Sequence, residues 1–188
     1  MVTYNMLCEI FEYSDYIPYS ELLQTTEWHE KRSCILLRDN NKCTSCDAPP
    51  TVNHYDQKLN KVVYIRFGDE EKVILKNGDV IFVPKVHVSA KQFSLHVHHK
   101  FYVENRLPWE YQDDELITLC NWCHQDLHDR EDIIVYSEDM LRRLMYDACD
   151  RCGGAGWFPE YKHVQGGICF KCGGSRYSLP GVKVKKNK

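Results

Sequence analysis

Four Cys-x-x-Cys pairs restrict what this chain can fold into more than any other feature. Two residues between cysteines let both thiolates of a tight turn reach one tetrahedral ion, so two pairs suffice for one four-thiolate zinc site. Four pairs predict two such sites. The alternative for paired cysteines is redox or disulfide chemistry. The pairs are Cys43/Cys46, Cys120/Cys123, Cys149/Cys152 and Cys169/Cys172, and Cys8 and Cys34 are left over.

Length and hydropathy place the chain among globular proteins. Its 188 residues, 43% of them hydrophobic, are enough for one packed domain with a small appendage. We expect no membrane partner, because no apolar run reaches the roughly 18 residues that a spanning helix needs. The N-terminus is acidic where a signal peptide is basic, so we expect a cytoplasmic protein. Disulfides are rare there, which favours metal binding by the cysteines.

Charge is distributed unevenly along the chain. Residues 140–188 hold ten Lys and Arg against three Asp and Glu, whereas the whole chain has a net charge of -3. Residues 177–188 form a basic tail that ends in VKVKKNK. This tail either contacts phosphates or serves as a solubilising terminus.

The pattern of apolar residues indicates an α+β fold. Residues 1–24 read as an N-terminal extension, and the spacing of apolar residues predicts a helix over Glu27–Asp39. Strand-like runs over about 51–92, with the turn signal Asn77-Gly78, predict a β-rich insertion. The insertion carries no chemical motif, and either widens the domain or contacts substrate.

Beyond the insertion, the sequence predicts a strand and two helices. Phe93–Val103 reads as a strand in which His99 lies on one face and His96 and His98 on the other. Asn121–Arg130 should be a helix, with Asn121 at its start. A connecting helix is expected within 131–147. The glycine-rich segment 148–176 should be a small module held together by zinc rather than by a core.

Four histidines bracket the second cysteine pair. His124 and His128 are four residues apart, so on a helix they share one face and can bind one metal ion. His98 or His99 can supply a third ligand, which leaves coordination positions for water or phosphate. The remaining histidine can take a proton from an attacking water. We expect His96 to be exposed or to contact phosphate.

Several pieces of the chain resemble, in order, the zinc-stabilised HNH endonucleases, whose active site is a ββα-metal motif. The resemblance spans residues 25–130 with the insertion at 51–92 as an interruption. It rests on Trp28, Arg32, Leu36, Arg38 and Asp39 before Cys43-Thr-Ser-Cys46, then LHVHHKFY at 95–102, Pro-Trp-Glu at 108–110 and LITLCNWCH at 116–124.

The resemblance implies a role for each matching residue. His99 matches the general base, and the four cysteines match the structural zinc ligands Cys43, Cys46, Cys120 and Cys123. By similarity to the DNase colicins, the catalytic metal is held by His98, His124 and His128. One departure concerns the asparagine that orients the base, because Glu115 stands at that position and could hold an imidazole N–H instead. The metal could be Zn²⁺, Ni²⁺ or Mn²⁺, which suit imidazole, or Mg²⁺.

The C-terminal module repeats the pattern Cys-x-x-Cys-x-Gly-x-Gly, with Arg176 in place of the last glycine of the second copy. This resembles one zinc centre of the cysteine-rich region of DnaJ chaperones, and implies a second structural zinc on Cys149, Cys152, Cys169 and Cys172. Trp157, Phe158 and Tyr161 would form its small core or stack on a splayed base. Basic residues around it favour DNA or else a protein partner, which includes a homodimer; they are Arg142, Arg143, Arg151, Lys162, Lys171 and Arg176.

These features together predict a metal-dependent HNH endonuclease that hydrolyses DNA. The alternative is a non-catalytic zinc module that binds nucleic acid or protein, and a third possibility is a thiol or chaperone-like protein. A purely structural domain needs the cysteines but none of the four histidines, which favours the first prediction.

Overall fold

The computed structural model describes residues 2–156, 158, 161, 164, 167, 169–172, 176–178 and 181–184. The predictions for Trp157, Lys162 and the last four residues of the basic tail fall outside this range. The α+β class is confirmed, with short and mostly antiparallel sheets. In chain order the elements are α1 (Tyr4–Ile10), β1 (Tyr16–Ile17), α2 (Tyr19–Leu22), α3 (Thr26–Arg38), β2 (Val52–Asp56), β3 (Lys61–Ile74), β4 (Val80–Ser89), β5 (Leu95–His99), β6 (Tyr102–Val103), the 3-10 turn η1 (Asp113–Glu115), β7 (Leu116–Cys120), α4 (Asn121–Arg130), β8 (Val135–Tyr136), β9 (Arg143–Leu144) and β10 (Val182–Lys183).

Helix α3 forms where the sequence predicts a helix. The Thr25 hydroxyl accepts a hydrogen bond from the backbone N–H of Trp28 and so caps the first turn. Trp28 and Ile35 point into the core and are almost fully buried. The helix ends at Asp39, whose carboxylate accepts from the N–H of Thr118 at 3.1 Å. This bond fixes the end of α3 against the free edge of β7.

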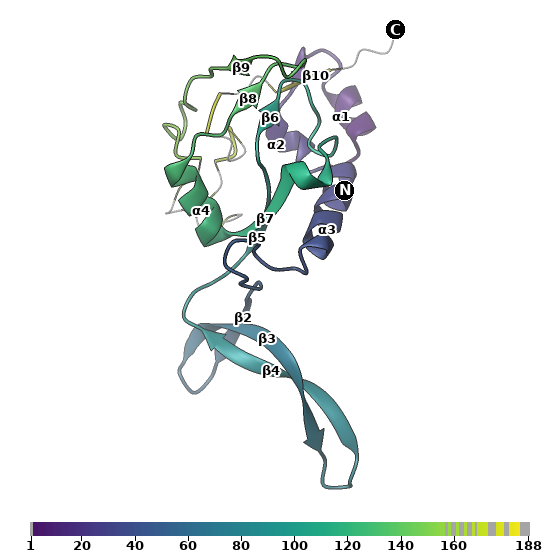
Figure 1. The fold of residues 1–188 in the computed structure, drawn as a ribbon, viewed down its shortest axis with the longest axis vertical. Coiled ribbons are helices and arrows are strands. Elements are labelled where there is room, and N and C mark those ends of the chain that lie inside the picture. The colour runs from purple at the N-terminus through teal and green to yellow at the C-terminus, as the bar shows by residue number, and fades with distance from the viewer. Residues whose placement is uncertain are drawn as a thin grey trace.

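Two antiparallel strands followed by a helix form the centre of the body. β5 pairs with β7 in a register that places His98 opposite Ile117 and Leu95 opposite Cys120. Helix α4 begins directly after β7 and spans the residues over which the sequence predicts a helix. Figure 1 shows α3 and α4 on opposite sides of this strand pair. The strands therefore carry their histidines between two helices.

Residues 1–24, which we expected to be an extension, instead supply part of the main core. Leu7, Ile17 and Leu22 are buried in one cluster with Tyr102 and Leu107. Because these apolar side chains are spread over α1, β1 and α2, no single stretch of the sequence displays them as a core face.

The C-terminal segment closes the fold by pairing with the N-terminal one. β10 runs antiparallel to β1, and Val182 is buried in the main core. The approach is so close that a Cβ at Gly181 would lie 2.3 Å from the Ile17 carbonyl oxygen, and Gly181 has φ +93°. Within the expected basic tail, Val182 and Lys183 therefore form a strand that packs against β1.

The helix expected within 131–147 is absent, and that prediction is wrong. Val135 pairs with Tyr102 of β6 and with Leu144 of β9. Between β8 and β9 the Ser137 hydroxyl accepts from the N–H of Arg142, and Met140 adopts a left-handed conformation with φ +58°. Serine and aspartate side chains that bond nearby backbone groups stabilise turns at the expense of helices.

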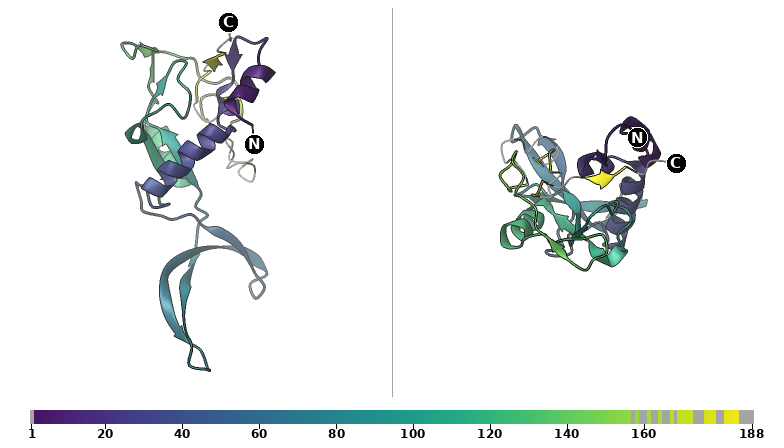
Figure 2. Two further views of the ribbon diagram at one scale, coloured as in Figure 1. Left: turned by 90° about the vertical axis from the view of Figure 1, so that its right-hand side faces the viewer. Right: turned by 90° about the horizontal axis from the view of Figure 1, so that it is seen from above.

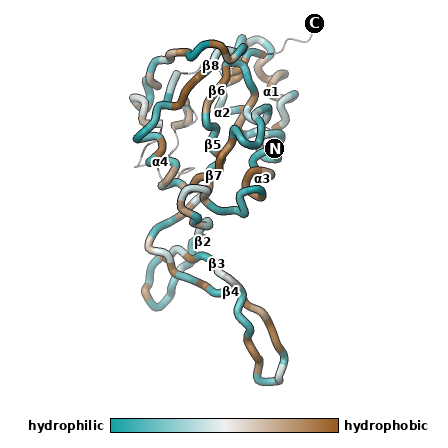
Figure 3. The backbone as a smooth tube through the Cα atoms, in the orientation of Figure 1, coloured by the Kyte–Doolittle hydropathy of each residue, from teal (hydrophilic) through white to brown (hydrophobic). Residues whose placement is uncertain are grey.

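The predicted insertion forms an arm of three strands, β2 to β4, that projects from the body (Figures 1 and 2). A turn at Asn77-Gly78 joins β3 to β4, as the sequence predicts. Thr51 and Phe93 exchange backbone and side-chain hydrogen bonds at the base of the arm. Apolar residues lie on both strands of its distal half (Figure 3), and Phe82 is 63% exposed.

Within the described residues, the helices are all too short or too polar to cross a lipid bilayer.

Candidate metal centres and the histidine pocket

The first group of four cysteines joins the end of α3 to the start of α4. Cys43 and Cys46 lie in the turn after α3, and Cys120 and Cys123 lie at the β7–α4 junction. Their sulfurs are all within 4.8 Å of one another, and the Cys46 and Cys120 Sγ atoms are 3.7 Å apart. Ligands about 2.3 Å from a tetrahedral zinc ion lie about 3.8 Å from each other, so the group fits one structural zinc.

The second group lies in the C-terminal module and has the same geometry. Sulfur pairs are 3.9 Å apart for Cys149 and Cys169 and 3.7 Å apart for Cys152 and Cys172. The N–H of Gly156 donates to the Cys152 sulfur, a bond that helps neutralise a thiolate. The two groups are together consistent with two structural zinc ions, as predicted from the paired cysteines.

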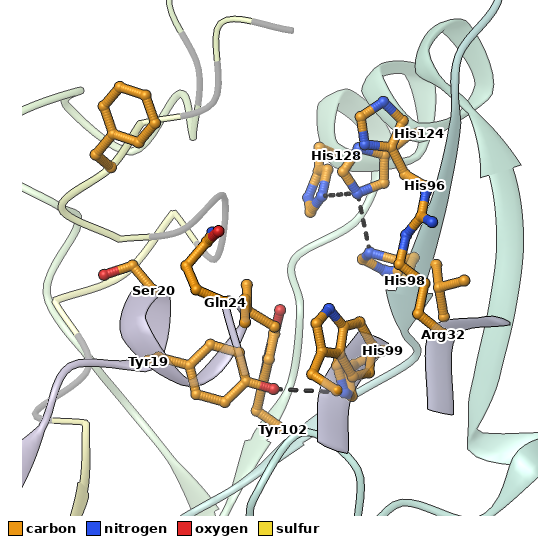
Figure 4. A pocket seen from close by; sticks show the side chains of 14 residues that line it. Tyr19, Ser20, Gln24, Arg32, His96, His98, His99, Tyr102, His124 and His128 are labelled. Atoms are coloured by element: carbon orange, nitrogen blue, oxygen red, sulfur yellow. Dashed lines mark hydrogen bonds between the residues drawn. The ribbon is translucent and has the colours of Figure 1, made fainter. Parts of the chain in front are cut away.

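Three histidines form a separate cluster between β5 and α4. His98 Nδ1 and His128 Nε2 each lie 3.1 Å from His124 Nε2 (Figure 4). Imidazole nitrogens about 2.0 Å from one tetrahedral ion lie about 3.3 Å apart, so the spacing fits three ligands of one metal. The sequence placed His124 and His128 on one helical face, and the strand pair brings His98 to them.

All three histidines are held neutral, the form in which imidazole binds metals. Burial, and after it the neighbouring His128, His99 and His96, together lower the pKa of His98 to about 3. Burial followed by the charge of Arg176 lowers the pKa of His128 to about 4. His124 shifts in the same direction, first through burial and then through His128. The three imidazole rings are therefore uncharged near neutral pH, and a metal ion does not have to compete with a bound proton for them.

His96 is half-buried and faces the same cluster, although we expected it to be exposed or to contact phosphate. Its ring stacks on that of His124 with centroids 5.3 Å apart and an angle of 5° between the planes. His96 Nε2 lies 3.1 Å from the Ser94 hydroxyl. Asn121 accepts from the N–H of Ser94 and donates its own N–H to the Ser94 carbonyl, which ties the start of α4 to β5. The Asn121–Ser94 contact therefore holds the start of α4 against the strand whose His96 ring stacks on His124.

His99 points away from the three histidines and into an aromatic cage. Its ring stacks against Trp28 at 5.0 Å and against Tyr102 at 5.4 Å, and meets the edge of Tyr111 at 4.6 Å. His99 Nε2 lies 3.0 Å from the Pro108 carbonyl oxygen. Because a carbonyl oxygen can only accept, Nε2 carries the hydrogen and Nδ1 is left with its lone pair. Burial lowers the pKa of His99 to about 4, so this lone pair is available at neutral pH.

Glu115 does not lie on His99, contrary to our expectation. Its carboxylate accepts from the N–H of Gln112 at 2.7 Å and pairs with Arg106 at 3.5 Å. The Pro108 carbonyl provides the acceptor that we assigned to Glu115. Every residue has a backbone carbonyl, so the residue types in the sequence could not identify Pro108 as the acceptor.

The histidines line a common cavity of about 200 Å³. His96, His98, His124 and His128 form one side of it, and Ser20 of α2 and Gln24, in the turn after α2, stand across from them (Figure 4). Trp28, Tyr19 and Phe170 complete the lining. Water has a liquid volume of about 30 Å³ per molecule, so the cavity holds more than a metal ion and one water.

Arg32 brings a permanent positive charge to this cavity. The residue lies one turn after Trp28 on α3, and its Nη2 donates to the Leu95 carbonyl at 2.9 Å. Burial lowers its pKa, but a guanidinium is basic enough to stay charged at pH 7. The cavity thus combines neutral metal-binding groups with one fixed cation.

Comparisons of the chain with models of known protein families, with curated proteins and with solved structures find no match. Any functional conclusion must therefore rest on the geometry of the site.

Proposed function

We propose that this protein is a metal-dependent endonuclease of the HNH type that hydrolyses phosphodiester bonds in DNA. One observation carries the proposal. A cluster of three histidines at ligating distances shares a cavity with a fourth histidine, His99, whose Nδ1 has a free lone pair. The first three satisfy the needs of a metal ion, and the fourth satisfies those of a general base.

The order of the elements supports the same proposal. β5 and β7 are antiparallel and lead directly into α4, with His98 on the first strand and His124 and His128 on the helix. A ββα-metal site has this arrangement. The cysteine zinc at the β7–α4 junction fixes the helix relative to the strands, so the histidine ligands are positioned on rigid elements.

The reaction that we propose divides the work among residues of the cavity. The Nδ1 atom of His99 takes a proton from water as the water oxygen attacks phosphorus. The P–O3′ bond breaks, and the leaving 3′ oxygen takes up a proton from solvent. The phosphate stays on the 5′ end of the downstream fragment. Arg32 donates to a non-bridging phosphate oxygen and balances part of its charge. His98, His124 and His128 would hold a divalent ion, which when bound would supply further positive charge near the phosphate.

Imidazole ligands restrict the choice of metal. Three neutral nitrogens suit Zn²⁺, Ni²⁺ or Mn²⁺ better than Mg²⁺, which prefers oxygen. We therefore expect activity with transition metals to exceed activity with Mg²⁺ at equal concentration.

A plasmid cleavage assay with a panel of divalent metals tests the proposal. Purified protein should convert supercoiled plasmid to nicked circles and leave 5′-phosphate ends, which a ligase can reseal. His99→Ala should abolish the conversion. If no metal supports cleavage, the endonuclease proposal fails, and the alternative of a non-catalytic zinc module that binds nucleic acid or protein takes its place.

A further inference from the structure

The cavity that the metal-binding histidines line also contains an exposed aromatic side chain from the C-terminal four-cysteine module. Phe170 lies between Cys169 and Cys172, which are almost fully buried, yet its own side chain is 45% exposed. It lines the same cavity as His98, His124 and His128. Single exposed apolar side chains are common on proteins, but this ring lines the cavity of the metal-binding histidines, where its face is open to a bound molecule.

The loop that carries Phe170 is held rigidly. Both neighbouring cysteines belong to the second four-cysteine group, so a zinc ion fixes the two ends of the turn. The other residue of the turn, Lys171, forms an ion pair with Asp150 at 2.6 Å. Phe170 is therefore the residue of this turn that remains available to the cavity, and its backbone has little freedom.

The module is also anchored to the helix that carries the metal-binding histidines. Arg176 donates through Nη1 to the His128 carbonyl and through Nε to the Gly154 carbonyl at 2.7 Å. Arg176 adopts φ +71°, whereas the matching residue of the first repeat is Gly156 with φ +79°. This left-handed conformation is unfavourable for a residue other than glycine, so the contact with α4 is kept despite strain.

Polar groups of α2 and of the turn that follows it line the same cavity. Ser20 is half-buried and Gln24 is exposed, and both line the cavity across from the histidines (Figure 4). Among the described residues no hydrogen-bond partner is found for either side chain. An aromatic ring beside a hydroxyl and an amide is the combination that recognises a nucleobase, by stacking on its face and bonding to its edge.

We propose that Phe170, with Ser20 and Gln24, forms a subsite for one unpaired nucleobase next to the scissile phosphate. This inference rests on the proposed function and names its substrate class, single-stranded or locally unwound DNA. A base within a duplex has both faces covered by its neighbours, so it must leave the stack to contact Phe170. The second zinc module then has a specific role, which is to present this ring to the cavity.

Binding of a fluorescein-labelled single-stranded DNA oligonucleotide, followed by fluorescence anisotropy, tests the subsite without any need for cleavage. All proteins carry His99→Gln, which keeps a side-chain donor for the Pro108 carbonyl and slows turnover enough for binding to be measured. Loss of one base–aromatic stack should weaken binding by about 5- to 100-fold in Phe170→Ala. Phe170→Trp should restore binding. Tyr13→Ala is the matched control, since Tyr13 is 94% exposed and outside the cavity lining.

A second set of oligonucleotides, each with one abasic site, locates the base. In the protein that keeps Phe170, an abasic site at one position should weaken binding about as much as Phe170→Ala weakens binding of the intact oligonucleotide. In the Phe170→Ala protein, the same abasic site should weaken binding no further. Elemental analysis must show unchanged zinc in each variant.

The subsite is overturned if Phe170→Ala binds the oligonucleotide as tightly as the protein that keeps Phe170. It is also overturned if the losses from Phe170→Ala and from every abasic site add fully, or if no variant binds the oligonucleotide. The nuclease proposal fails separately, in the plasmid assay. Tight Phe170-dependent binding without cleavage would therefore keep the subsite and reject the nuclease.

Discussion

Pro108 contributes one carbonyl oxygen to the site, and that atom decides the tautomer of His99. The 3.0 Å contact to Nε2 leaves Nδ1 as the only ring nitrogen that can accept a proton. Trp28 and Tyr102 sandwich the ring and prevent it from turning. A general base needs a defined lone pair in a defined direction, and here backbone and aromatic neighbours provide both.

At the same scale, His124 is the centre of the metal-binding cluster, because both other ligands lie 3.1 Å from its Nε2. We predict that the wild-type protein binds three metal ions per chain and that His124→Ala binds two. The four-cysteine groups should retain theirs, since neither uses a histidine. Elemental analysis after gel filtration measures the count. A wild-type chain with only two ions under saturating metal would contradict the third site.

His29→Ala provides the control for that experiment. His29 lies on α3 and is not part of any metal-binding group among the described residues. Its removal should leave the metal count unchanged.

At the scale of elements, α4 receives support from both sides. The first zinc group fixes its start at Cys120 and Cys123, and Arg176 of the second module bonds the carbonyl of His128 near its end. The two four-cysteine modules thus hold the two ends of α4, the helix that carries His124 and His128. Neighbours that orient metal ligands commonly alter metal affinity when they are removed.

Substitution of Arg176 should separate stability from metal affinity. Arg176→Gly removes the contact with α4 but relieves the left-handed backbone, which costs an arginine about 1–2 kcal/mol. We predict an unchanged or slightly higher melting temperature together with an affinity of the histidine site that is lower by about 10- to 100-fold. Competition titration with a chromophoric chelator measures the affinity.

Arg151→Ala is the matched control, because Arg151 is an exposed arginine of the same module. Equal affinities for wild type and Arg176→Gly would show that α4 does not depend on the second module.

Sequence patterns predicted the elements whose signals are local. The paired cysteines, the i, i+4 histidines of α4 and the Asn77-Gly78 turn each depend on residues close together in the chain. Two of the wrong or missing predictions involve distant partners. The Pro108 carbonyl replaces Glu115, and Phe170 reaches the cavity only through the folding of the C-terminal module. The helix expected within 131–147 is a local error, because a Ser137–Arg142 turn outcompetes the helical pattern there.

At the scale of the whole molecule, the chain consists of a body and a projecting arm (Figure 2). In the body, the N-terminal segment and the described C-terminal strand share one core around Ile17 and Val182. The histidine cavity lies between segments from both ends of the chain and the central strands. Its assembly therefore requires the complete body.

The arm should be separable from this body. Thr51 and Phe93 are hydrogen-bonded at its base, so a short glycine-asparagine turn in place of residues 53–90 can join the two strands without strain. We predict that the shortened protein keeps its three metal ions and that its melting temperature changes by only a few degrees. Calorimetry and elemental analysis provide the two measurements. Loss of the histidine metal on removal of the arm would show that the two parts depend on each other.

The most direct test of the whole account is the nicking rate of metal-saturated His99→Gln relative to wild type. Glutamine can still donate to the Pro108 carbonyl, so the variant should retain three metal ions and its fold, which removes metal loss as an explanation. A general base contributes about 100- to 10,000-fold to a rate. We predict a loss of that size in the rate at which supercoiled plasmid is nicked. Equal rates for the two fully metallated proteins would contradict the assignment of His99 as the base.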